Sequence, residues 1–322
     1  MHHAIDTLIE KLKLQHKSWN TIKTYRDWSN RYATWLNSHR HLAKETSEAK
    51  VEAYLTGLAK DRVSASTQNQ AFHALIAFYK LGLNRPLAET VNALRAQRPQ
   101  RIRTAPDLAV ITQLLQLVTD HGGYPTRLLI HLLYACGLRV SEGCHLRIRD
   151  INLTHHTLLL REAKGNKDRL VVYPPALTPA IERQIRRARL TFEADLEARI
   201  PINLPHQLAK KYPAFTRAWE WAWLVPQHDP CHHPITNELV RHHLHEANLQ
   251  RTMRTANRAA GLTGITPHHL RHAYATHAHR AGVTLRDLQT HLGHSHLETT
   301  ARYITPTPTP IPSPYEALNI QL

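Results

Sequence analysis

Cysteine and long apolar runs are scarce in this sequence. Only three of the 322 residues are cysteine, and none of them forms a Cys-x-x-Cys pair, so we expect neither a disulfide framework nor a zinc ribbon. No run approaches the roughly 18 to 20 apolar residues that cross a bilayer. The first residues, MHHAIDTLIEKLK, lack a secretory core. We therefore expect a cytoplasmic protein that has no membrane partner.

Acidic residues are scarce relative to basic ones. Lys and Arg number 41 against 25 Asp and Glu, which gives a formal net charge of +16 and a pI of about 10.0. Apolar residues make up 42% of the chain, which is enough for a packed core and too much for a disordered chain. A basic excess of this size indicates a polyanionic partner, most often nucleic acid.

Motifs for metals and nucleotides are also missing. The chain has no HExxH motif and no GxxxxGK[ST] phosphate loop. Its 26 histidines have no carboxylate at ligand spacing, so we predict no metal site and no cofactor. A compositional preference for histidine, where Gln or Lys would serve equally well on the surface, accounts for their number.

Hydrophobic periodicity predicts a helical N-terminal region. From Thr21, apolar side chains recur at steps of three and four residues on one face (Ile22, Tyr25, Trp28, Tyr32 and Trp35). A second helix begins at Ser47, and a third, capped by Ser66 or Thr67, ends at Gly82. We interpret the aromatic stripe as core. The alternative is that its exposed members stack on bases.

The pattern changes after this region. Residues 95–106 (RAQRPQRIRTAP) combine two prolines with four arginines and indicate a basic linker. Two β-rich runs, 157–161 and 169–173, flank a turn and predict a hairpin. The alternating prolines of 305–314 exclude a helix and predict an extended arm. The fold class is therefore mainly α-helical with a small β-sheet or hairpin.

Four short motifs contain the candidate chemistry, in a fixed order. They are CGLRVSE with Arg139, AKGNKDR with Lys164, PHHLRHAYATH with His268 and Arg271, and LGHSHLETTARY with His294 and Tyr303. Each motif alone is weak. Together, and in this order, they resemble the tyrosine recombinase (phage integrase) superfamily over nearly the whole chain.

The resemblance implies how the chain is divided. We expect a helical domain that binds the core recombination site, a basic linker, a catalytic domain with an insertion, and a proline-rich C-terminal arm. The limits that we predict are 1–94 for the helical domain, 95–106 for the linker, 107–304 for the catalytic domain, about 192–245 for the insertion and 305–322 for the arm. Within the linker, Arg101 and Arg103 would contact DNA phosphates.

The resemblance also implies a reaction, which is the cutting and rejoining of DNA strands through a 3′-phosphotyrosine link. Tyr303 is the nucleophile, and its phenol, with an ordinary pKa of about 10, needs a base or a strong positive field. Arg139 and Arg271 offer permanently charged forks that match the nonbridging phosphate oxygens. Because the covalent link conserves the energy of the broken bond, rejoining needs no ATP. No metal is needed either, because the arginines take its place.

The remaining members of the set transfer protons. The family assigns protonation of the leaving 5′ oxygen to the lysine at the position of Lys164, and Lys167 is a nearby competitor that we also count as a DNA contact. His268 is suited to accept the tyrosine proton, and His294 to donate a hydrogen bond to the phosphate.

The insertion resembles that of integron integrases. Its segments LPHQLAKKYPAFTRAWEWAWLVP and RHHLHEANLQRTMRTANRAAG, and the terminal SPYEAL, are similar to that branch. In the branch this region recognises bases that protrude from a folded single-stranded site. By position, Trp221 and His242 would hold such bases, with Trp219, Trp223 and Pro230 as neighbours. The alternative is that the tryptophans anchor the insertion to the catalytic core.

The chain departs from that branch in two places. HAYATH stands where Ser-Phe is usual after the histidine, and ITPTP follows Tyr303 where Thr-His-Val is usual. The second change alters the arm through which, in the family, four subunits form a synaptic tetramer on DNA. Three alternatives remain open: a resolvase- or phage-type recombinase acting on duplex sites, a catalytically decayed DNA-binding protein, and a metal-dependent nuclease.

Overall fold

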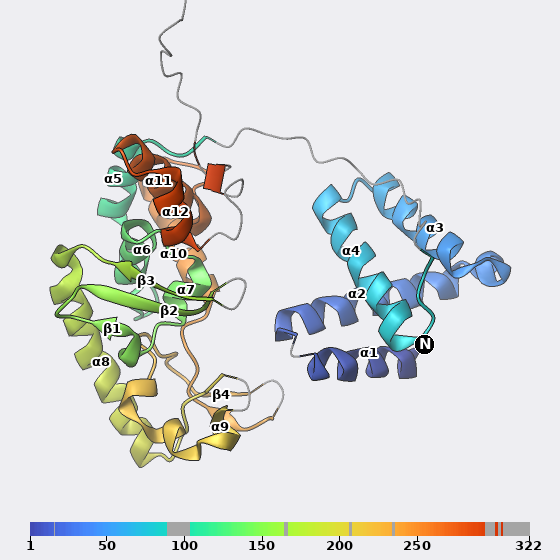
Figure 1. Cartoon of the computed structure of the whole chain (residues 1–322), viewed down its shortest axis with the longest axis horizontal. Coiled ribbons are helices and arrows are strands. Elements are labelled where there is room, and N and C mark those ends of the chain that lie inside the picture. The colour runs from blue at the N-terminus through green and yellow to red at the C-terminus, as the bar shows by residue number, and fades with distance from the viewer. Residues whose placement is uncertain are drawn as a thin grey trace, which may run out of the picture. The chain divides into compact units, whose positions relative to one another are not determined.

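The chain is divided into two compact units, Met1–Arg101 and Ile102–Leu322 (Figure 1). The structure is a computed structural model, and it describes residues 1–15, 17–88, 104–163, 167–205, 208–233, 236–293, 300–301 and 304. The described part is mainly helical with a few short strands, which confirms the predicted fold class. None of its helices is long and apolar enough to cross a membrane.

The first unit is entirely helical in its described residues. Its elements are α1 (His2–Leu14), α2 (Trp19–Ser38), a 3-10 helix (Arg40–Lys44), α3 (Ser47–Lys60), α4 (Ala65–Ala77) and a π-helical turn (Phe78–Gly82). Trp28 and Tyr32 are buried, and Tyr25 and Trp35 pack against the same core. The hydroxyls of Tyr32 and Tyr79 lie 2.8 Å apart inside it. The aromatic stripe is therefore core, as the periodicity predicts.

The predicted cap of the third helix is wrong. α4 begins at Ala65, and Ser64 is its N-cap: the Ser64 hydroxyl accepts from the backbone N–H of Thr67 at 3.3 Å. Ser64 has extended backbone angles (φ −59°, ψ 145°), whereas Ser66 and Thr67 already lie within the helix. The Gln68 amide donates to the carbonyl of Val63 at 2.7 Å, which holds the helix to this earlier start. Three hydroxyl side chains within four residues made the sequence ambiguous at this point.

The second unit is built on a buried helix. Its helices are α5 (Leu108–Leu117), α6 (Thr126–Ala135), α7 (Val140–Cys144), α8 (Thr178–Glu197), α10 (Glu246–Ala259), α11 (Pro267–Arg280) and α12 (Leu285–Leu292). Leu129, Ile130, Leu132 and Leu133 of α6 are fully buried. α10 and α11 pack against α6, and α12 packs against α11. The apolar side chains of α6 thus lie at the centre of the second unit, while Arg127 near its start is exposed.

The predicted hairpin is present. β1 (Ile151–Asn152), β2 (Thr157–Ala163) and β3 (Lys167–Val172) form an antiparallel sheet in this order, with Leu158 opposite Val171 and Leu160 opposite Arg169. The register shifts between Leu160 and Ala163, next to the tip. Leu158, Leu160 and Val171 are buried in the core. The hairpin is therefore held by one face, and the tip with Lys164 lies outside the described residues.

The insertion has a small core of its own, beside the far end of α8 (yellow and orange in Figure 1). It contains α9 (Leu208–Lys211), 3-10 turns at Pro213–Arg217 and Trp219–Trp221, and the paired strands β4 (Cys231–His232) and β5 (Leu239–Val240). Arg241, directly after β5, forms a buried ion pair with Asp195 of α8. The guanidinium donates from Nε at 2.7 Å and from Nη2 at 2.5 Å. This pair attaches the insertion to α8.

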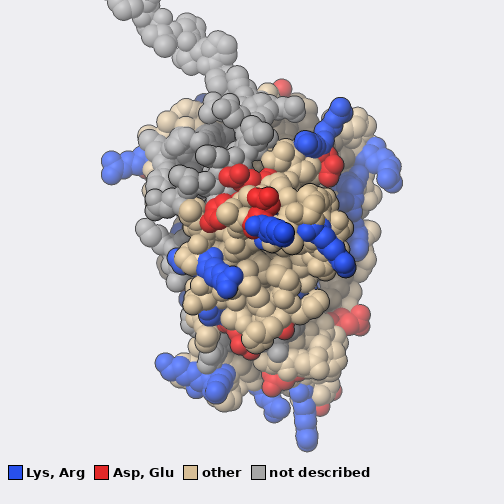
Figure 2. Space-filling model, turned by 90° about the vertical axis from the view of Figure 1, so that its right-hand side faces the viewer, with Lys and Arg blue, Asp and Glu red and all other residues tan. Residues whose placement is uncertain are grey.

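The basic excess is not gathered into one patch on the visible face in Figure 2. Lys and Arg side chains are scattered over that face, and Asp and Glu side chains lie among them.

Candidate active site

Arg139 lies at a tight turn between two helices. Cys136 is the C-cap of α6, Gly137 has a left-handed φ of +60°, and Arg139 is the N-cap of α7. A Cβ at position 137 would lie 2.5 Å from Cδ1 of Tyr274, so this turn requires glycine for its conformation and for its space. The turn predicted after Gly137 is confirmed, and it presents Arg139 at the start of a short helix.

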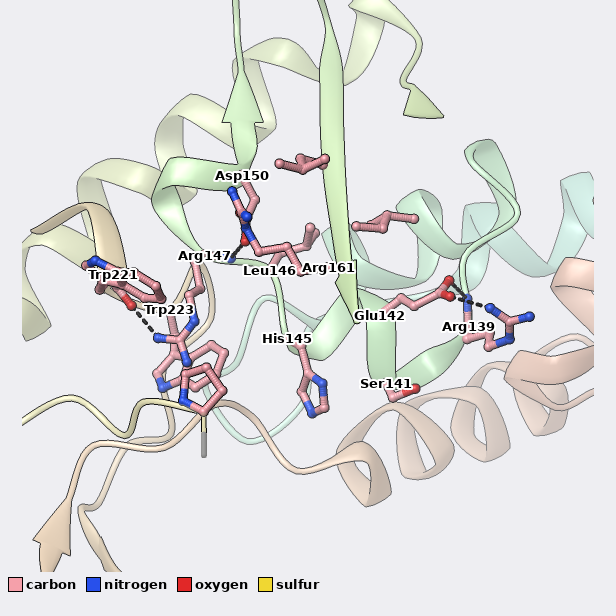
Figure 3. A pocket seen from close by; sticks show the side chains of 13 residues that line it. Arg139, Ser141, Glu142, His145, Leu146, Arg147, Asp150, Arg161, Trp221 and Trp223 are labelled. Carbon is pink, nitrogen blue, oxygen red and sulfur yellow. Dashed lines mark hydrogen bonds and ion pairs between the residues drawn. The ribbon is translucent and has the colours of Figure 1, made fainter. Parts of the chain in front are cut away.

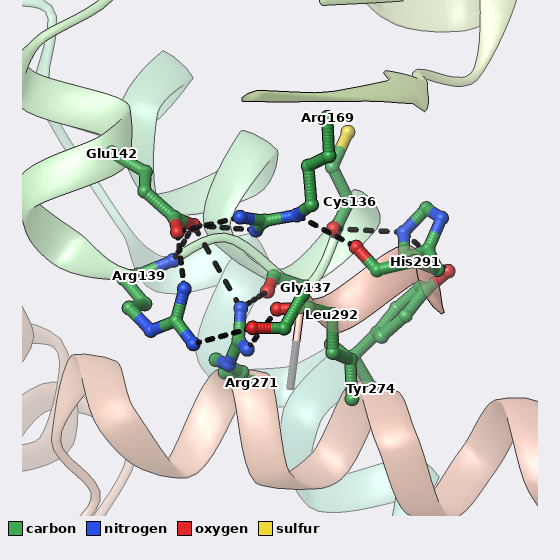
Figure 4. Close-up of polar contacts among 10 residues, drawn as sticks. Cys136, Gly137, Arg139, Glu142, Arg169, Arg271, Tyr274, His291 and Leu292 are labelled. Carbon is green, nitrogen blue, oxygen red and sulfur yellow. Dashed lines mark hydrogen bonds and ion pairs between the residues drawn. The ribbon is translucent and has the colours of Figure 1, made fainter. Parts of the chain in front are cut away.

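Arg271 binds the same turn from the opposite side. It lies on α11, its side chain is only 1% exposed, and its Nη1 donates to the carbonyl of Gly137 at 2.6 Å. Its Nη2 donates to the carbonyl of Leu292, at the end of α12, also at 2.6 Å. One guanidinium therefore joins the Arg139 turn to the segment that leads to His294 (Figure 4).

Glu142 is the carboxylate at the centre of this group. It accepts from the backbone N–H and Nη1 of Arg139, at 2.8 and 2.5 Å, and Nη1 of Arg271 lies 3.7 Å from it. Arg169 of β3 adds a bidentate fork, at 2.8 and 2.7 Å (Figure 4). Burial alone would raise the pKa of Glu142, but the hydrogen bonds and charges of Arg169 and Arg139 lower it to about 2.

Three guanidiniums thus share one carboxylate. The cluster carries an excess of positive charge at neutral pH, because Glu142 stays ionised and three guanidiniums surround this single carboxylate. The Arg139 side chain is 23% exposed, against 9% for Arg169 and 1% for Arg271, so Arg139 is the member most open to an incoming anion. Such a fixed positive field stabilises the charge that develops on a phosphate during transfer.

His268 lies one helical turn before Arg271, in the first turn of α11, where it is exposed. Residues three apart on a helix are neighbours on its surface. The structure therefore brings Arg139, Arg271 and His268 to the same end of the catalytic unit. Lys164, His294 and Tyr303 lie outside the described residues, as do Arg101 and Arg103, and the side chain of Lys167, at the start of β3, is not described.

The sequence reasoning missed Glu142 and Arg169, although both stand inside the motifs CGLRVSE and AKGNKDR. A signal existed for Glu142, because an acid three residues after an N-cap completes a capping box. For Arg169 the only signal was a charged residue directly before the apolar run LVVY. Its partner is 27 residues away, so only the fold identifies it.

A second feature opens beside Arg139. A cavity of about 420 Å³ lies between α7, β2 and the insertion (Figure 3). Its wall includes Arg139, His145, Arg161, Trp221 and Trp223. Aromatic rings and guanidinium groups together form a surface on which a nucleic-acid base can stack.

Two of the three tryptophans face this cavity. Trp221 stacks on Phe215 at a centroid distance of 5.2 Å, with the Arg149 guanidinium 3.8 Å from its ring centre. Trp223 donates from Nε1 to the carbonyl of Arg241 at 3.1 Å, and the Arg147 guanidinium lies 3.5 Å from its ring centre. Both side chains are largely buried, so they also pack the insertion against the catalytic core.

Trp219 does not line the cavity; its ring packs on Phe192 of α8 at 5.3 Å. His242 stacks with Trp223 at 6.0 Å, and burial lowers the pKa of His242. Pro230 precedes β4, and since Cys231 pairs with Val240, Pro230 and His242 lie at the same end of this strand pair.

Among the described residues, no group of three or more His, Cys, Asp or Glu side chains could hold a metal ion.

Comparisons with known proteins agree with this architecture. The family described as "Phage integrase family" matches residues 107–309, and "Phage integrase, N-terminal SAM-like domain" matches residues 5–89. A protein named "Integrase/recombinase" from Escherichia coli is 36% identical over 305 residues, covering 93% of this chain and 88% of its own. Tyrosine recombinase XerC from Halalkalibacterium halodurans is 30% identical, covering 80% of this chain and 77% of its own.

Solved structures show the same fold. The integrase of transposon Tn1549, in complex with transposon right end DNA, has a TM-score of 0.61 at 14% identity and covers 95% of both chains. The XerH site-specific recombinase bound to difH substrate has a TM-score of 0.60 at 18% identity, covering 92% of this chain and 80% of its own. The chain therefore belongs to the phage integrase family and is a tyrosine recombinase.

Proposed function

We propose that this enzyme is a site-specific recombinase of the integron integrase type, which inserts and excises gene cassettes at folded single-stranded DNA sites. The observation that carries this proposal is the aromatic cavity between the insertion and Arg139. A base that protrudes from a folded strand would enter this cavity beside Trp221 and Trp223, while the neighbouring phosphate meets the arginine cluster. Recognition of this kind depends on shape and stacking more than on base sequence.

The reaction proposed is a transesterification. The hydroxyl oxygen of Tyr303 attacks the scissile phosphorus, a 3′-phosphotyrosine bond forms, and the bond to the 5′ oxygen breaks. His268 accepts the phenol proton, Lys164 protonates the leaving oxygen, and Arg139, Arg271 and His294 bind the nonbridging oxygens. Attack by the 5′ hydroxyl of another strand reverses these steps and releases the tyrosine. The balance needs no cofactor and no metal.

Relatives of known structure support DNA as the partner, because the XerH and Tn1549 proteins are described in complex with DNA. We propose binding of duplex sites and folded single strands, with assembly into a synaptic tetramer on the DNA, in the cytoplasm at the nucleoid. Under this proposal Lys167, Arg101 and Arg103 contact phosphates, and Trp221 and His242, with Trp219, Trp223 and Pro230 nearby, serve the protruding bases. Within this group, the packing of Trp219 on Phe192 favours a supporting role.

The first test uses a folded single-strand cassette site with a nick just 3′ of the cleavage position. Loss of the short fragment traps the covalent protein–DNA complex, which migrates slowly on a denaturing gel. We expect the slow band with the wild type in the presence of chelator, and no such band with Tyr303→Phe. Cleavage that leaves no covalent band and is abolished by chelator would instead support a metal-dependent nuclease. If the wild type and the variant both bind DNA but neither forms the covalent band, the protein is a decayed recombinase.

The second test separates the integron type from its alternative. The alternative is a resolvase-type recombinase that acts on duplex sites, and the observation that supports it is the 30% identity to a protein named tyrosine recombinase XerC. In Trp221→Ala, we expect cleavage of the folded strand to fall while cleavage of a nicked duplex site is retained. Cleavage of duplex sites alone by the wild type, or an equal loss on both substrates in the variant, would favour the alternative.

A further inference from the structure

We infer that Arg169 is a positioning residue for the cleavage step, which holds the hairpin, the Arg139 turn and the end of α12 in one arrangement. This inference rests on the catalytic set proposed above. Each of the three elements leads to or carries a member of that set: Lys164 at the hairpin tip, Arg139 at the turn and His294 after α12. Arg169 itself reaches none of the reacting atoms through a described contact.

The contacts of Arg169 make this linkage explicit. Its two terminal nitrogens bind the two oxygens of Glu142, at 2.8 and 2.7 Å. Its Nε donates to the carbonyl of His291, in the last turn of α12, at 2.8 Å. The side chain is 9% exposed, so water competes weakly for these bonds. A lysine could not make all three, because it lacks the planar fork.

Gly293 is shaped to accept this side chain. A Cβ at position 293 would lie 3.0 Å from both Cδ and Nη1 of Arg169, and Gly293 has a left-handed φ of +65° as the C-cap of α12. The chain turns there directly into His294. The end of α12 therefore lies against Arg169, and a displacement of the guanidinium would move Gly293, which His294 follows in the sequence.

Arg169 also sets the charge state on which Arg139 depends. Its hydrogen bond and charge are the largest of the influences that lower the pKa of Glu142, and they oppose the effect of burial. Without Arg169 the pKa of Glu142 rises, and a protonated Glu142 no longer pairs with Arg139. Geometry and charge thus both predict a loss of cleavage that is separate from DNA binding.

The test measures single-turnover cleavage of the nicked substrate at saturating protein, DNA binding, and thermal unfolding, for Arg169→Gln and Arg169→Lys. We expect Arg169→Gln to slow cleavage about 100-fold, the size of effect that a small misplacement produces, with binding within about threefold of wild type. We expect the rate of Arg169→Gln to begin to fall at a higher pH than that of wild type as the solution is acidified, because removal of Arg169 raises the pKa of Glu142. Arg169→Lys keeps the charge, and it should restore the wild-type pH dependence but only part of the rate.

The matched control is Arg241→Gln. Arg241 forms a comparably buried bidentate pair with Asp195, away from the Glu142 cluster. This variant should lose thermal stability to a similar extent and keep the wild-type pH dependence of cleavage.

Three outcomes would overturn the inference while leaving the proposed function in place, provided that the wild type forms the covalent complex. They are cleavage by Arg169→Gln within about threefold of wild type, a loss of cleavage no larger than the loss of binding, and the same change of pH dependence in Arg241→Gln. Absence of the covalent complex in the wild type on every substrate would instead overturn the proposed function, and the inference with it.

Discussion

Glu142→Gln tests how much the buried arginine cluster contributes to stability. The substitution keeps the size of the side chain but removes the charge that three guanidiniums share. Because the folded structure lowers the pKa of Glu142 from 4.5 to about 2, its ionised form favours folding by about 3 kcal/mol, at 1.36 kcal/mol per pKa unit. The loss of one partner from a buried ion pair costs about 3 to 5 kcal/mol. We therefore expect Glu142→Gln to destabilise the catalytic unit by about 3 kcal/mol at pH 7.

The pH dependence of this effect has a definite direction. A carboxyl whose folded pKa is lowered stabilises the protein fully above its unfolded pKa of about 4.5, and the contribution is lost as the pH falls through about 2. The difference between wild type and Glu142→Gln should therefore be constant from pH 7 to pH 5 and shrink steadily below pH 4.5. The glutamine variant, which has no proton to gain at this position, should depend less on pH in that range.

The assay is urea unfolding, followed by tryptophan fluorescence at pH 7, 5, 4 and 3. Three tryptophans lie in the first unit and three in the insertion of the second, so fluorescence reports on both units. Because Glu142 lies in the second unit, the unfolding transition whose urea midpoint shifts in the variant is assigned to that unit. A difference below about 1 kcal/mol at pH 7, the size of an exposed pair, would refute the reasoning. So would a difference that stays the same down to pH 3.

Three further predictions concern the turn, the nucleophile and the charge. Gly137→Ala should destabilise the protein by about 1 to 3 kcal/mol, because residue 137 has a left-handed backbone and an added Cβ would contact Tyr274. The control is Gly57→Ala in α3, where nothing lies within 4 Å of the added Cβ, and it should be neutral or stabilising. Equal melting temperatures of the two variants would contradict the argument. Tyr303→Phe should bind DNA with wild-type affinity in a gel-shift assay yet form no covalent complex, and a remaining covalent band would require another nucleophile. The logarithm of the DNA association constant should fall steeply and linearly as the logarithm of the salt concentration rises. An association constant that stays the same between about 50 and 200 mM salt would argue against phosphate contacts.

Local patterns predicted the elements well because the forces that form them act over a few residues. The spacing of Ile22, Trp28 and Tyr32 along one face predicts α2 and its burial, and the β-rich runs predict the hairpin. The start of α4 was harder, because several hydroxyl residues in a row can each act as a cap. The contacts of Gln68 with Val63 and of Ser64 with Thr67 decided among them.

The candidate site was only partly visible in the sequence. Arg139 and Arg271 stand in recognisable motifs, and the structure brings them to one turn although they are separated by more than 130 residues. Trp221 and Trp223 were expected either to hold bases or to anchor the insertion. The structure shows their packing against the core and their place in the wall of the cavity, and the Trp221→Ala test separates the two roles.

The sequence by itself determined the helical and hairpin elements, the basic character and the order of the motifs, because these depend on composition and on neighbours along the chain. Only the tertiary structure decided that Arg169 and Glu142 pair, that Gly293 leaves room for that guanidinium, and that a cavity opens between the insertion and Arg139. Each of these depends on groups far apart in the chain that meet in a buried place. In such a place water competes weakly for hydrogen bonds, so the geometry and the charge balance of the buried groups decide which contacts form.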